Sequence, residues 1–563
     1  MSTESGRATS RAALAAAGIG SMAGLVEGLQ LNLARSSPTI LAPYKVSADI
    51  LWVAPAVNAI GFALAGLVLA PLARRVAPRQ ADRILASGLV GVAAAINLYT
   101  LKVIHPFSVL LLALGIGVAV FRLSEARIRR VLTGAARFAP VSVLLLGVLA
   151  VGVRASRAVQ EKRAIAALPA GTRDLPSVLI LLLDTVRRDR FDAGPDSALT
   201  PRIREFARQA TWFSNAWSTT SWSLPSQASL LTGVHPHEHG ADWPSLAIRS
   251  GLRTLPERFA AAGYVTGAFS SNAAWIVPEH LGRGFHRFRV YRFEDLLRRT
   301  LVGRAMDRPL IALGKHTSGR GRPAARVSAD LLDFLDAGGS RPFFAYLCYM
   351  DVNRTFHRRQ LGHPAWKPQP GMPSVVAAYD SGLTALDAEV GSLLDRLRAR
   401  GDLENTIVVI LSDHGESFPG GPVGDHPPAG HGTSLYPEQV RVPLWISRPG
   451  GSTPDTVEAD VSIRDVPLTI TTLAGLGTDG LGGVSLVSRT AGPSDVLATL
   501  RYAGREANAL VSERFLLIEQ LDGGARRPRV FFMAEDSLAQ VDRAADSVRT
   551  AQLLARLRAA LGG

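Results

Sequence analysis

Cysteine is almost absent from this chain of 563 residues, which contains only Cys348. A single thiol forms no intramolecular disulfide, so a disulfide-stapled scaffold is excluded and the fold depends on packed cores. The scarcity leaves the cellular compartment open, because many proteins outside the cytoplasm lack disulfides. The simplest interpretation of Cys348 is a buried structural thiol. The sequence also contains no evident internal repeat, which argues against a repeat architecture.

Acidic residues are scarce in the first 170 residues, which hold 6 Asp and Glu against 18 Lys and Arg. The remainder of the chain holds 41 and 44, so most of the formal charge of +15 belongs to the N-terminal part. The chain is also 47% hydrophobic, which indicates a membrane portion. The basic excess is therefore explained by arginines in membrane loops and argues against a nucleic-acid partner.

Five apolar segments predict membrane helices, at residues 12–33, 49–72, 84–101, 106–121 and 138–153. The last two are the shortest. The alternative for the first segment is a cleaved signal peptide, with Arg7 and Arg11 as its charged region, but further apolar segments follow it. Glu27 lies inside the first segment, where it either extends toward the membrane interface or serves a substrate path.

The distribution of basic residues predicts the orientation of these helices. The loops after the second and fourth segments are rich in arginine: Arg74, Arg75, Arg79, Arg83, Arg122, Arg127, Arg129, Arg130 and Arg137. This pattern predicts a multi-pass protein of the cytoplasmic (inner) membrane, with a cytoplasmic N-terminus and, after five spans, a C-terminal domain on the extracytoplasmic side. Basic residues mark the cytoplasmic side, so the four that follow the fifth segment oppose this orientation: Arg154, Arg157, Lys162 and Arg163. Without a fifth span the domain would be cytoplasmic.

The stretch from Trp222 to Gly233 is the centre of the candidate site. Ser223 precedes Pro225, a favoured first-turn residue of a helix, and Gly233 is a natural helix end. A hydroxyl at a helix N-terminus faces the positive end of the helix dipole, which favours an alkoxide or a bound anion. Taken alone, such a serine is more often only a helix cap.

Two continuous apolar runs, 176–183 and 406–411, are typical of buried parallel strands. The first ends at Asp184, and the second leads to Asp413 and His414. Ligands of open α/β sheets bind outside the carboxyl ends of the strands, so these side chains and Ser223 are expected to converge. Two carboxylates, an imidazole and a hydroxyl suit one divalent metal ion.

These segments resemble motifs of the sulfatase family within the alkaline phosphatase superfamily. The matching pieces are Leu-Leu-Leu-Asp-Thr-Val-Arg-Arg-Asp at 181–189, Ser-Leu-Pro-Ser-Gln-Ala-Ser-Leu-Leu-Thr-Gly at 223–233 and Ser-Asp-His-Gly-Glu at 412–416, followed by His431-Gly432 and Val442-Pro443-Leu444. The resemblance covers roughly residues 174–480, in the order of the family. It implies an α/β fold with a mainly parallel sheet flanked by helices, like that of alkaline phosphatase.

The predicted organisation has four parts: a transmembrane helical region at 1–153, a linker at 154–175, a catalytic domain at 176–485 and a small α+β subdomain at 486–563. Within the last part, Arg501-Tyr502, Ala509–Ile518 and Arg529–Met533 are expected to be short antiparallel strands, and 538–561 a closing helix. The segment His235–Gly240 is expected to be a loop rich in imidazoles near the site.

The site chemistry follows from these residues. A metal held by Asp184, Asp413 and His414 would take Ser223 as a further ligand and lower its pKa, so that the alkoxide attacks phosphorus or sulfur. We expect His431 to orient the substrate or protonate the leaving group. A histidine ligand favours manganese or zinc, while magnesium and calcium stay possible.

Departures from the family pattern bear on the substrate. Sulfatases that use formylglycine resemble Cys/Ser-x-Pro-x-Arg, and Gln227 stands here in place of the arginine, so an unmodified Ser223 is the simpler interpretation. Thr185 stands where typical sulfatases carry a second aspartate, so the larger calcium site is not expected. The chain is most similar to the membrane-anchored branch that includes lipoteichoic-acid synthase and phosphoethanolamine transferases.

Four further residues are candidates for binding the substrate: Gln227, His239, Asn272 and Asn353. Relatives often carry histidines that bind the transferred group where Cys348 and Asn353 stand. The sequence thus predicts a membrane-anchored, metal-dependent hydrolase or transferase that acts through Ser223 on a sulfate- or phosphate-type ester. Its expected partners are a lipid or envelope-polymer substrate and the bilayer. The alternative is a catalytically degenerate relative that binds or scaffolds in the envelope.

Overall fold

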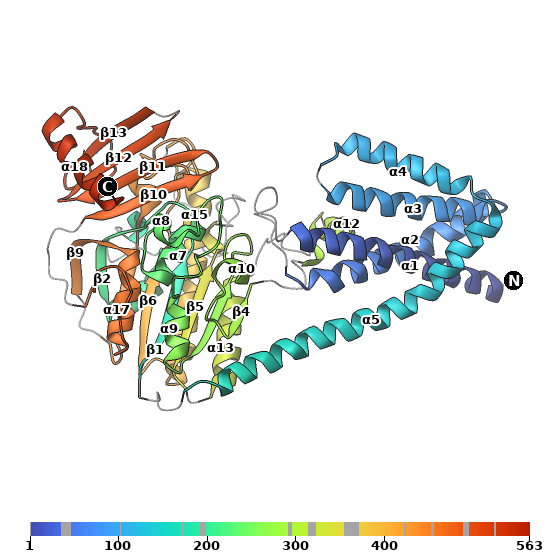
Figure 1. Cartoon of the computed structure of the whole chain (residues 1–563), viewed down its shortest axis with the longest axis horizontal. Helices are drawn as coiled ribbons and strands as arrows, with labels where there is room; N and C mark the ends of the chain where they lie inside the picture. The colour runs from blue at the N-terminus through green and yellow to red at the C-terminus, as the bar shows by residue number, and fades with distance from the viewer. Residues whose placement is uncertain are drawn as a thin grey trace. The chain divides into compact units, whose positions relative to one another are not determined.

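The computed structural model describes residues 2–34, 47–101, 103–169, 174–191, 199–290, 296–312, 323–339, 341–353, 371–421, 424–451, 455–487, 495–522 and 525–562. The chain divides into two compact units (Figure 1). The N-terminal unit comprises residues 1–162 and 291–320, and the larger unit comprises residues 163–290 and 321–563. The segment 291–320, which the sequence placed inside the catalytic domain, therefore clusters with the N-terminal helices.

Each of the five predicted membrane segments is helical. The helices are α1 (Ser2–Ala34), α2 (Ile50–Val76), α3 (Ala81–Thr100), α4 (Pro106–Phe121) and α5 (Glu125–Ala166). Four of them are long and apolar enough to cross a membrane, and α4, with 16 residues, is shorter. Helix α5 continues without a break through the first part of the predicted linker.

Helices α1 and α2 pack closely because α1 presents glycines at every fourth position. A Cβ added at Gly24 would lie 2.5 Å from the carbonyl oxygen of Ala54, and Gly20 and Gly28 make similar approaches to α2. Small residues at this spacing let two helix backbones come together without intervening side chains, as is common between membrane helices.

Glu27 of α1 is buried in this unit and joins three segments of the chain. Its Oε2 accepts a hydrogen bond of 2.8 Å from Nδ2 of Asn58 in α2. Its Oε1 accepts one of 2.9 Å from the backbone N–H of Leu301, the first residue of α12 (Leu301–Ala312). The carboxylate thus satisfies one of the backbone donors that a helix N-terminus leaves free.

The larger unit is built on a nine-stranded sheet with the order β4-β3-β5-β1-β6-β8-β2-β7, in which β9 also pairs with β2. The strands are β1 (Ser177–Leu183), β2 (Thr211–Trp217), β3 (Val265–Ser270), β4 (Arg287–Arg289), β5 (Phe343–Tyr349), β6 (Thr406–Leu411), β7 (Arg441–Val442), β8 (Leu444–Ser447) and β9 (Asp455–Ser462). The strands from β4 to β6 pair in parallel, and β8 is antiparallel to both β6 and β2. This arrangement confirms the predicted mainly parallel sheet.

Helices surround the main sheet, as the alternation of strands and helices predicted. The residues Leu179, Leu181 and Leu183 of β1 belong to a hydrophobic core that also includes residues of three helices: α6 (Pro201–Ala207), α13 (Ala324–Gly338) and α15 (Ser374–Ala399). Successive side chains of a strand point to opposite faces, so the alternate residues of β1 face the other side. The remaining helices include α7 (Ser223–Thr232), α9 (Leu255–Ala261) and α17 (Val466–Leu473), together with short turns at α8 (Pro236–His239), α10 (Pro278–Leu281) and α16 (Pro437–Val440).

The C-terminal part forms a separate antiparallel sheet of four strands: β10 (Val496–Tyr502), β11 (Arg505–Ser512), β12 (Phe515–Asp522) and β13 (Ala525–Phe532). Helix α18 (Ser547–Ala560) packs on this sheet. In Figure 1 the sheet lies at the end of the main sheet where β1 and β6 terminate. The backbone N–H of Thr499 in β10 donates to the carbonyl of Thr219, just before α7.

Three local predictions are wrong. The predicted strand 509–518 is two strands, because the chain reverses at Glu513 and Arg514, which both have positive φ angles. The predicted closing helix begins at Ser547 and not at residue 538, with Asp546 capping it through a hydrogen bond to the N–H of Arg549. The imidazole-rich segment after Gly233 is not a plain loop, since Pro236–His239 forms one helical turn.

Candidate functional site

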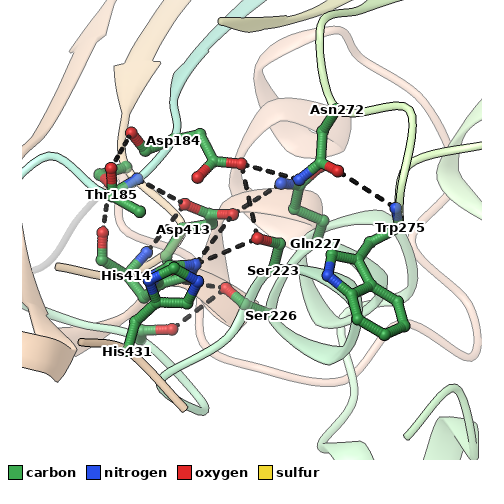
Figure 2. A network of polar contacts seen from close by, with 12 residues as sticks. Asp184, Thr185, Ser223, Ser226, Gln227, Asn272, Trp275, Asp413, His414 and His431 are labelled. Atoms are coloured by element: carbon green, nitrogen blue, oxygen red, sulfur yellow. Dashed lines mark hydrogen bonds and ion pairs between the residues drawn. The ribbon is translucent and has the colours of Figure 1, made fainter. Parts of the chain in front are cut away.

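The site lies where two neighbouring parallel strands end. Because β1 and β6 pair in register, with Leu182 opposite Leu411, Asp184 and Asp413 emerge side by side. His414 follows at once, and potential ligand atoms of these three buried residues lie within 4.8 Å of one another. Figure 2 shows the three side chains around a common centre, as the sequence predicted.

The turn after β1 is strained and firmly held. Thr185 has a φ of 65°, a left-handed conformation that is costly for a β-branched residue. The hydroxyl of Tyr379 donates to the carbonyl of Thr185 (2.7 Å) and accepts from the N–H of Arg187 (2.8 Å). The hydroxyl oxygen of Ser412 accepts a hydrogen bond of 2.9 Å from the N–H of Val186. These contacts fix Asp184 at the head of the turn.

Ser223 is the first residue of α7, and Gly233 ends this helix with a φ of 77°, as the sequence predicted. The Ser223 Oγ lies 3.1 Å from Nε2 of His414 and donates a long hydrogen bond of 3.4 Å to Oδ2 of Asp184. The side chain therefore points into the centre formed by the two strand ends (Figure 2). At the N-terminus of α7 it also faces the positive end of the helix dipole.

His414 presents Nε2 toward Ser223 because its other ring nitrogen is already bonded. Its Nδ1 lies 2.9 Å from the carbonyl oxygen of Gly415, to which it donates a hydrogen bond. Burial lowers the pKa of His414, which favours the neutral ring. A neutral imidazole whose Nδ1 carries the proton leaves the Nε2 lone pair available to a metal ion.

The two carboxylates show that this centre suits a cation. Burial raises the pKa of Asp184 well above its usual value, and the charge of Asp413 raises it further. The Oδ1 of Asp184 is buried and has no hydrogen-bond partner among the described residues. Two buried carboxylates, one of them with an unpartnered oxygen, and the Nε2 lone pair of His414 are the kind of donor set that suits a divalent metal ion.

Gln227 lies one helical turn after Ser223 and supports Asp413. Its Nε2 donates a hydrogen bond of 2.6 Å to Oδ2 of Asp413, and its Oε1 accepts one of 2.6 Å from the hydroxyl of Tyr346. Its Nε2 also lies 3.8 Å from Sγ of Cys348, whose thiol is buried as predicted. The fully buried Gln227, which the sequence predicts to bind the substrate, thus contacts Asp413, a candidate metal ligand.

The other three substrate-binding candidates lie in different surroundings from one another. Asn272 joins the site, since its Nδ2 donates a hydrogen bond of 3.0 Å to Oδ2 of Asp184. His239 is buried under α7, where its Nε2 lies 3.1 Å from both the Ser229 hydroxyl and the Pro225 carbonyl. Asn353 is buried in the helical turn 351–353 after β5.

His431 lies beside the centre and is paired with a residue that sequence reasoning missed. The rings of His431 and His414 have centroids 4.7 Å apart. The Nδ1 of His431 donates a hydrogen bond of 3.0 Å to Oε2 of Glu416, whose side chain is fully buried. Burial lowers the pKa of His431, but the Glu416 carboxylate outweighs this and raises the pKa to about 9. The pairing holds His431 in its charged form near neutral pH.

Arg187 is a second residue that the motif analysis did not single out. Its side chain is almost fully buried and forms ion pairs of 2.8 Å with Asp189 and with Asp425. It also donates a hydrogen bond of 2.9 Å to the carbonyl of Glu416. The guanidinium therefore ties the turn after β1 to the loop that carries Glu416 and leads to His431. Its position shortly after Asp184 and the nearby acidic residue Asp189 are features of the sequence that could have indicated this ion pair.

Comparisons with known proteins agree with this geometry. The family model described as Sulfatase matches residues 176–476, just over half of the chain. The human N-sulphoglucosamine sulphohydrolase is 28% identical over 336 residues, which cover 52% of this chain and 60% of that protein. The ulvan-active sulfatase of Formosa agariphila is 26% identical, over 55% of this chain and 64% of the relative. The match thus spans less than two thirds of either relative.

Solved structures are similar in fold. A phosphonate monoester hydrolase from Silicibacter pomeroyi superimposes with a TM-score of 0.52 at 20% identity, covering 69% of this chain and 94% of that chain. The phosphonate monoester hydrolase of Agrobacterium radiobacter gives 0.51 at 18% identity, with 69% and 95% covered. At these identities the likeness establishes only the fold. From the family match over residues 176–476, the chain belongs to the sulfatase family.

Proposed function

We propose that this protein is a membrane-anchored, metal-dependent enzyme that cleaves or transfers a sulfate- or phosphate-type ester through Ser223. The observation that carries the proposal is the position of the Ser223 Oγ, 3.1 Å from Nε2 of His414 and 3.4 Å from Oδ2 of Asp184. A nucleophile at a helix N-terminus and beside a metal-ligand set has the surroundings that ester-transfer chemistry requires.

Asp184, Asp413 and His414 would hold one divalent cation, to which Ser223 would add its hydroxyl oxygen. The histidine favours manganese or zinc over calcium. A divalent ion in this position supplies positive charge that favours the serine alkoxide and neutralises anionic oxygens of the substrate. Asn272 and Gln227 would orient the two carboxylates through their amide hydrogen bonds.

In the proposed reaction, Ser223 forms the new bond and His431 supplies the proton for the leaving group. Ser223 loses its hydroxyl proton to solvent, and its Oγ forms a bond to the phosphorus or sulfur of the substrate. The bond from that atom to the alcohol oxygen breaks, and His431, held charged by Glu416, gives its proton to the departing oxygen. Attack by water on the serine ester then completes hydrolysis, or attack by a second alcohol completes transfer.

The residue at position 227 favours phosphate-type esters. A formylglycine hydrate expels sulfate through its second hydroxyl, whereas a plain serine depends on water or an acceptor attacking its ester. Gln227 stands where the formylglycine signal has arginine, and its amide is already occupied by Asp413 and Tyr346. An unmodified Ser223 that forms a phosphoserine intermediate is therefore the mechanism that we propose.

The N-terminal helices would place this chemistry at the outer face of the cytoplasmic membrane. Arg157 of α5 pairs with Asp49 at the start of α2 (2.8 Å), and the contact of Glu27 with Leu301 lies near the same end of α2. The arginines clustered around the α2–α3 and α4–α5 connections, most of them in the adjoining helix ends, belong to the opposite ends of these helices. By the positive-inside rule that opposite side is cytoplasmic. A lipid or envelope-polymer ester is the substrate that fits this location.

The test is turnover by the purified full-length protein, assayed on ethyl phosphate, the monoethyl ester of methylphosphonate and ethyl sulfate with manganese or zinc. We expect hydrolysis that a chelator abolishes and that Ser223→Ala lowers by at least about a thousandfold. Ser245→Ala, at an exposed serine, is the matched control. The intact mass of the Ser223 peptide adds a second readout. A phospho-type adduct supports the proposal, and the loss of two hydrogens means formylglycine and contradicts it.

A stable, metal-loaded protein that turns over none of these esters would contradict the enzymatic proposal. That result would favour the alternative, in which the protein is a catalytically degenerate relative that binds or scaffolds in the envelope. It would gain further if the Ser223→Ala variant kept the biological role in the cell of origin.

A further inference from the structure

One face of helix α5 is exposed and carries three arginines around a hollow. The hollow has a volume of about 310 Å³ and is lined by Arg129, Arg130, Thr133, Gly134 and Arg137. A Cβ added at Gly134 would have no heavy atom within 4 Å, so the glycine keeps this space open. The hollow is therefore a recess between long basic side chains on a single helix.

The opposite face of α5 packs against the other helices of the N-terminal unit. A Cβ added at Gly18 of α1 would overlap the backbone carbonyl of Ala135, which belongs to a hydrophobic cluster with residues of α1, α2 and α3. The buried residues of α5 are Ile128, Ala135, Ala139, Ser142 and Leu146. At about 3.6 residues per turn, they lie on the side of the helix away from Arg130 and Arg137. The arginine face thus points out of the helical unit.

Two of these arginines are available to a ligand. Arg130 and Arg137 are exposed, and neither makes a hydrogen bond or an ion pair with any residue that the structure describes. Arg129 pairs with Glu125 at 3.6 Å. Arg74, at the end of α2, instead donates a hydrogen bond of 3.0 Å to a backbone carbonyl of α1. Two guanidinium groups without an anionic partner, beside an open hollow, suit a phosphate group.

The arginine face of α5 continues as an apolar surface. Val141, Leu144 and Val148 are exposed by 51%, 67% and 63%. They follow Arg137 at intervals of four, three and four residues, and such spacing keeps them on its face of the helix. At a rise of about 1.5 Å per residue, the stretch from Arg137 to Val148 is about 16 Å long. This length is close to one leaflet of a hydrocarbon core about 30 Å thick.

These observations discriminate between kinds of ligand. A soluble phosphate ester would use the arginines but not the apolar stretch. A zwitterionic lipid would cover the apolar stretch, but its ammonium group would meet the positive charge of the arginines. A phospholipid with a net negative headgroup has phosphate oxygens that accept from guanidinium groups and acyl chains that cover the apolar stretch. The arginine-rich end of α5 is also the end proposed to be cytoplasmic, where the bilayer surface is negatively charged.

We propose that this face of α5 is a binding site for an anionic phospholipid of the cytoplasmic leaflet, with the phosphate between Arg130 and Arg137 and the acyl chains along residues 141–148. The inference rests on the membrane anchoring included in the proposed function, and the site takes no part in the ester chemistry. A lipid held there would fix the depth and rotation of α5, the helix that continues into the linker before β1.

The test is native mass spectrometry of the full-length protein in dodecyl maltoside micelles, with phosphatidylglycerol and phosphatidylcholine of equal acyl chains. We expect phosphatidylglycerol to bind at least about tenfold more tightly. Arg130→Gln combined with Arg137→Gln should lower its affinity about thirtyfold, since each guanidinium contributes a factor of about five. Arg75→Gln combined with Arg79→Gln removes the same charge at exposed positions of the other arginine cluster. This matched control should leave the affinity within about twofold.

Filling the hollow distinguishes a shaped site from a diffuse positive surface. Gly134→Leu adds a side chain where a Cβ meets no neighbour, and it keeps the net charge. We expect it to lower the affinity for phosphatidylglycerol about fivefold or more. Gly147→Leu, at another open glycine of α5, is the matched control and should leave the affinity as it is. An unaltered affinity in Gly134→Leu, or equal losses in the two arginine pairs, overturns the inference.

Inorganic phosphate, titrated into the same samples, distinguishes a lipid from a free anion. Displacement of phosphatidylglycerol by phosphate at the concentration of the lipid would show that the acyl chains contribute nothing, and it would overturn the lipid as the ligand. Membrane anchoring is checked separately, by carbonate washing of membranes that contain the full-length protein. Release into the soluble fraction contradicts the anchoring in the proposed function. Retained protein that does not prefer phosphatidylglycerol contradicts only the lipid site.

Discussion

Gln227 donates a hydrogen bond of 2.6 Å from its Nε2 to the Oδ2 of Asp413. Gln227→Ala would leave this carboxylate oxygen and the hydroxyl of Tyr346 without their partner. Because such supporting residues orient metal ligands, we expect the affinity for manganese or zinc to fall about 10- to 100-fold, as measured by calorimetric titration. Gln209→Ala, at an exposed glutamine, is the control. An affinity equal to that of the unaltered protein would show that Asp413 keeps its orientation without this contact.

Metal binding should stabilise the fold, because a cation compensates the two buried carboxylates at the ends of β1 and β6. A ligand present at about 100 times its Kd adds about 2.7 kcal/mol of stability. We expect the Tm of the purified protein to rise on addition of manganese or zinc, and to rise little in Asp413→Asn. The contrary result is a Tm that does not respond to either metal, measured over millimolar concentrations.

Glu416 is expected to serve catalysis through His431. Glu416→Gln removes the carboxylate that holds the histidine in its charged form. Protonation matters most for a poor leaving group, so kcat should fall about tenfold or more for ethyl phosphate and much less for p-nitrophenyl phosphate. Glu438→Gln is a matched control, since Glu438 contacts a different histidine, His426, at 3.2 Å. Equal losses for both esters would remove leaving-group protonation from the role of this pair.

Arg187 should be important for stability rather than for chemistry. Arg187→Met leaves Asp425, which is buried, and Asp189 without their cation. Loss of one partner of a buried ion pair typically costs about 3–5 kcal/mol. We expect a loss of that size in the free energy of unfolding. Arg202→Met, which breaks an exposed pair with Asp395, should cost less than about 1 kcal/mol. Comparable losses in the two variants would argue against the tie between β1 and the Glu416 loop.

Asp387 is expected to make the free energy of unfolding depend on pH. Its carboxylate accepts hydrogen bonds from the N–H groups of Arg202 and Ile203 at the start of α6, but burial outweighs them and raises the pKa of Asp387 to about 6. A raised pKa means that the folded state binds the proton more tightly. The stability from this group is therefore complete below about pH 4 and is lost as the pH rises through about 6.

Asp387→Asn removes that dependence. We expect the stability of the variant relative to the unaltered protein to improve by about 2 kcal/mol between pH 4 and pH 7, measured by denaturant unfolding. Asp333→Asn, at an exposed aspartate, is the control and should show no such trend. A difference between Asp387→Asn and the unaltered protein that stays constant with pH would contradict the prediction.

The residues that could be predicted from sequence are those whose role is fixed by a local pattern. Asp184 and Asp413 follow long apolar runs, and Ser223 precedes a proline and a glycine at helix spacing, so strand ends and a helix start were visible. The 412–416 motif includes Glu416, but its pairing with His431 could not be predicted, because the contact depends on how two loops fold together. The hairpin at Glu513 and Arg514 was not predicted for another reason, because neither residue type usually marks a turn with positive φ.

The path of the chain has a consequence for release by proteolysis. The chain passes from the N-terminal unit to the larger one, returns at 291–320 and leaves again. A cut between residues 163 and 175 therefore separates two polypeptides without separating two folded bodies. The C-terminal fragment still carries α12, which remains bonded to Glu27 through Leu301. Shedding of a soluble enzyme would require a second event, either unfolding of this docked segment or cleavage on both sides of it.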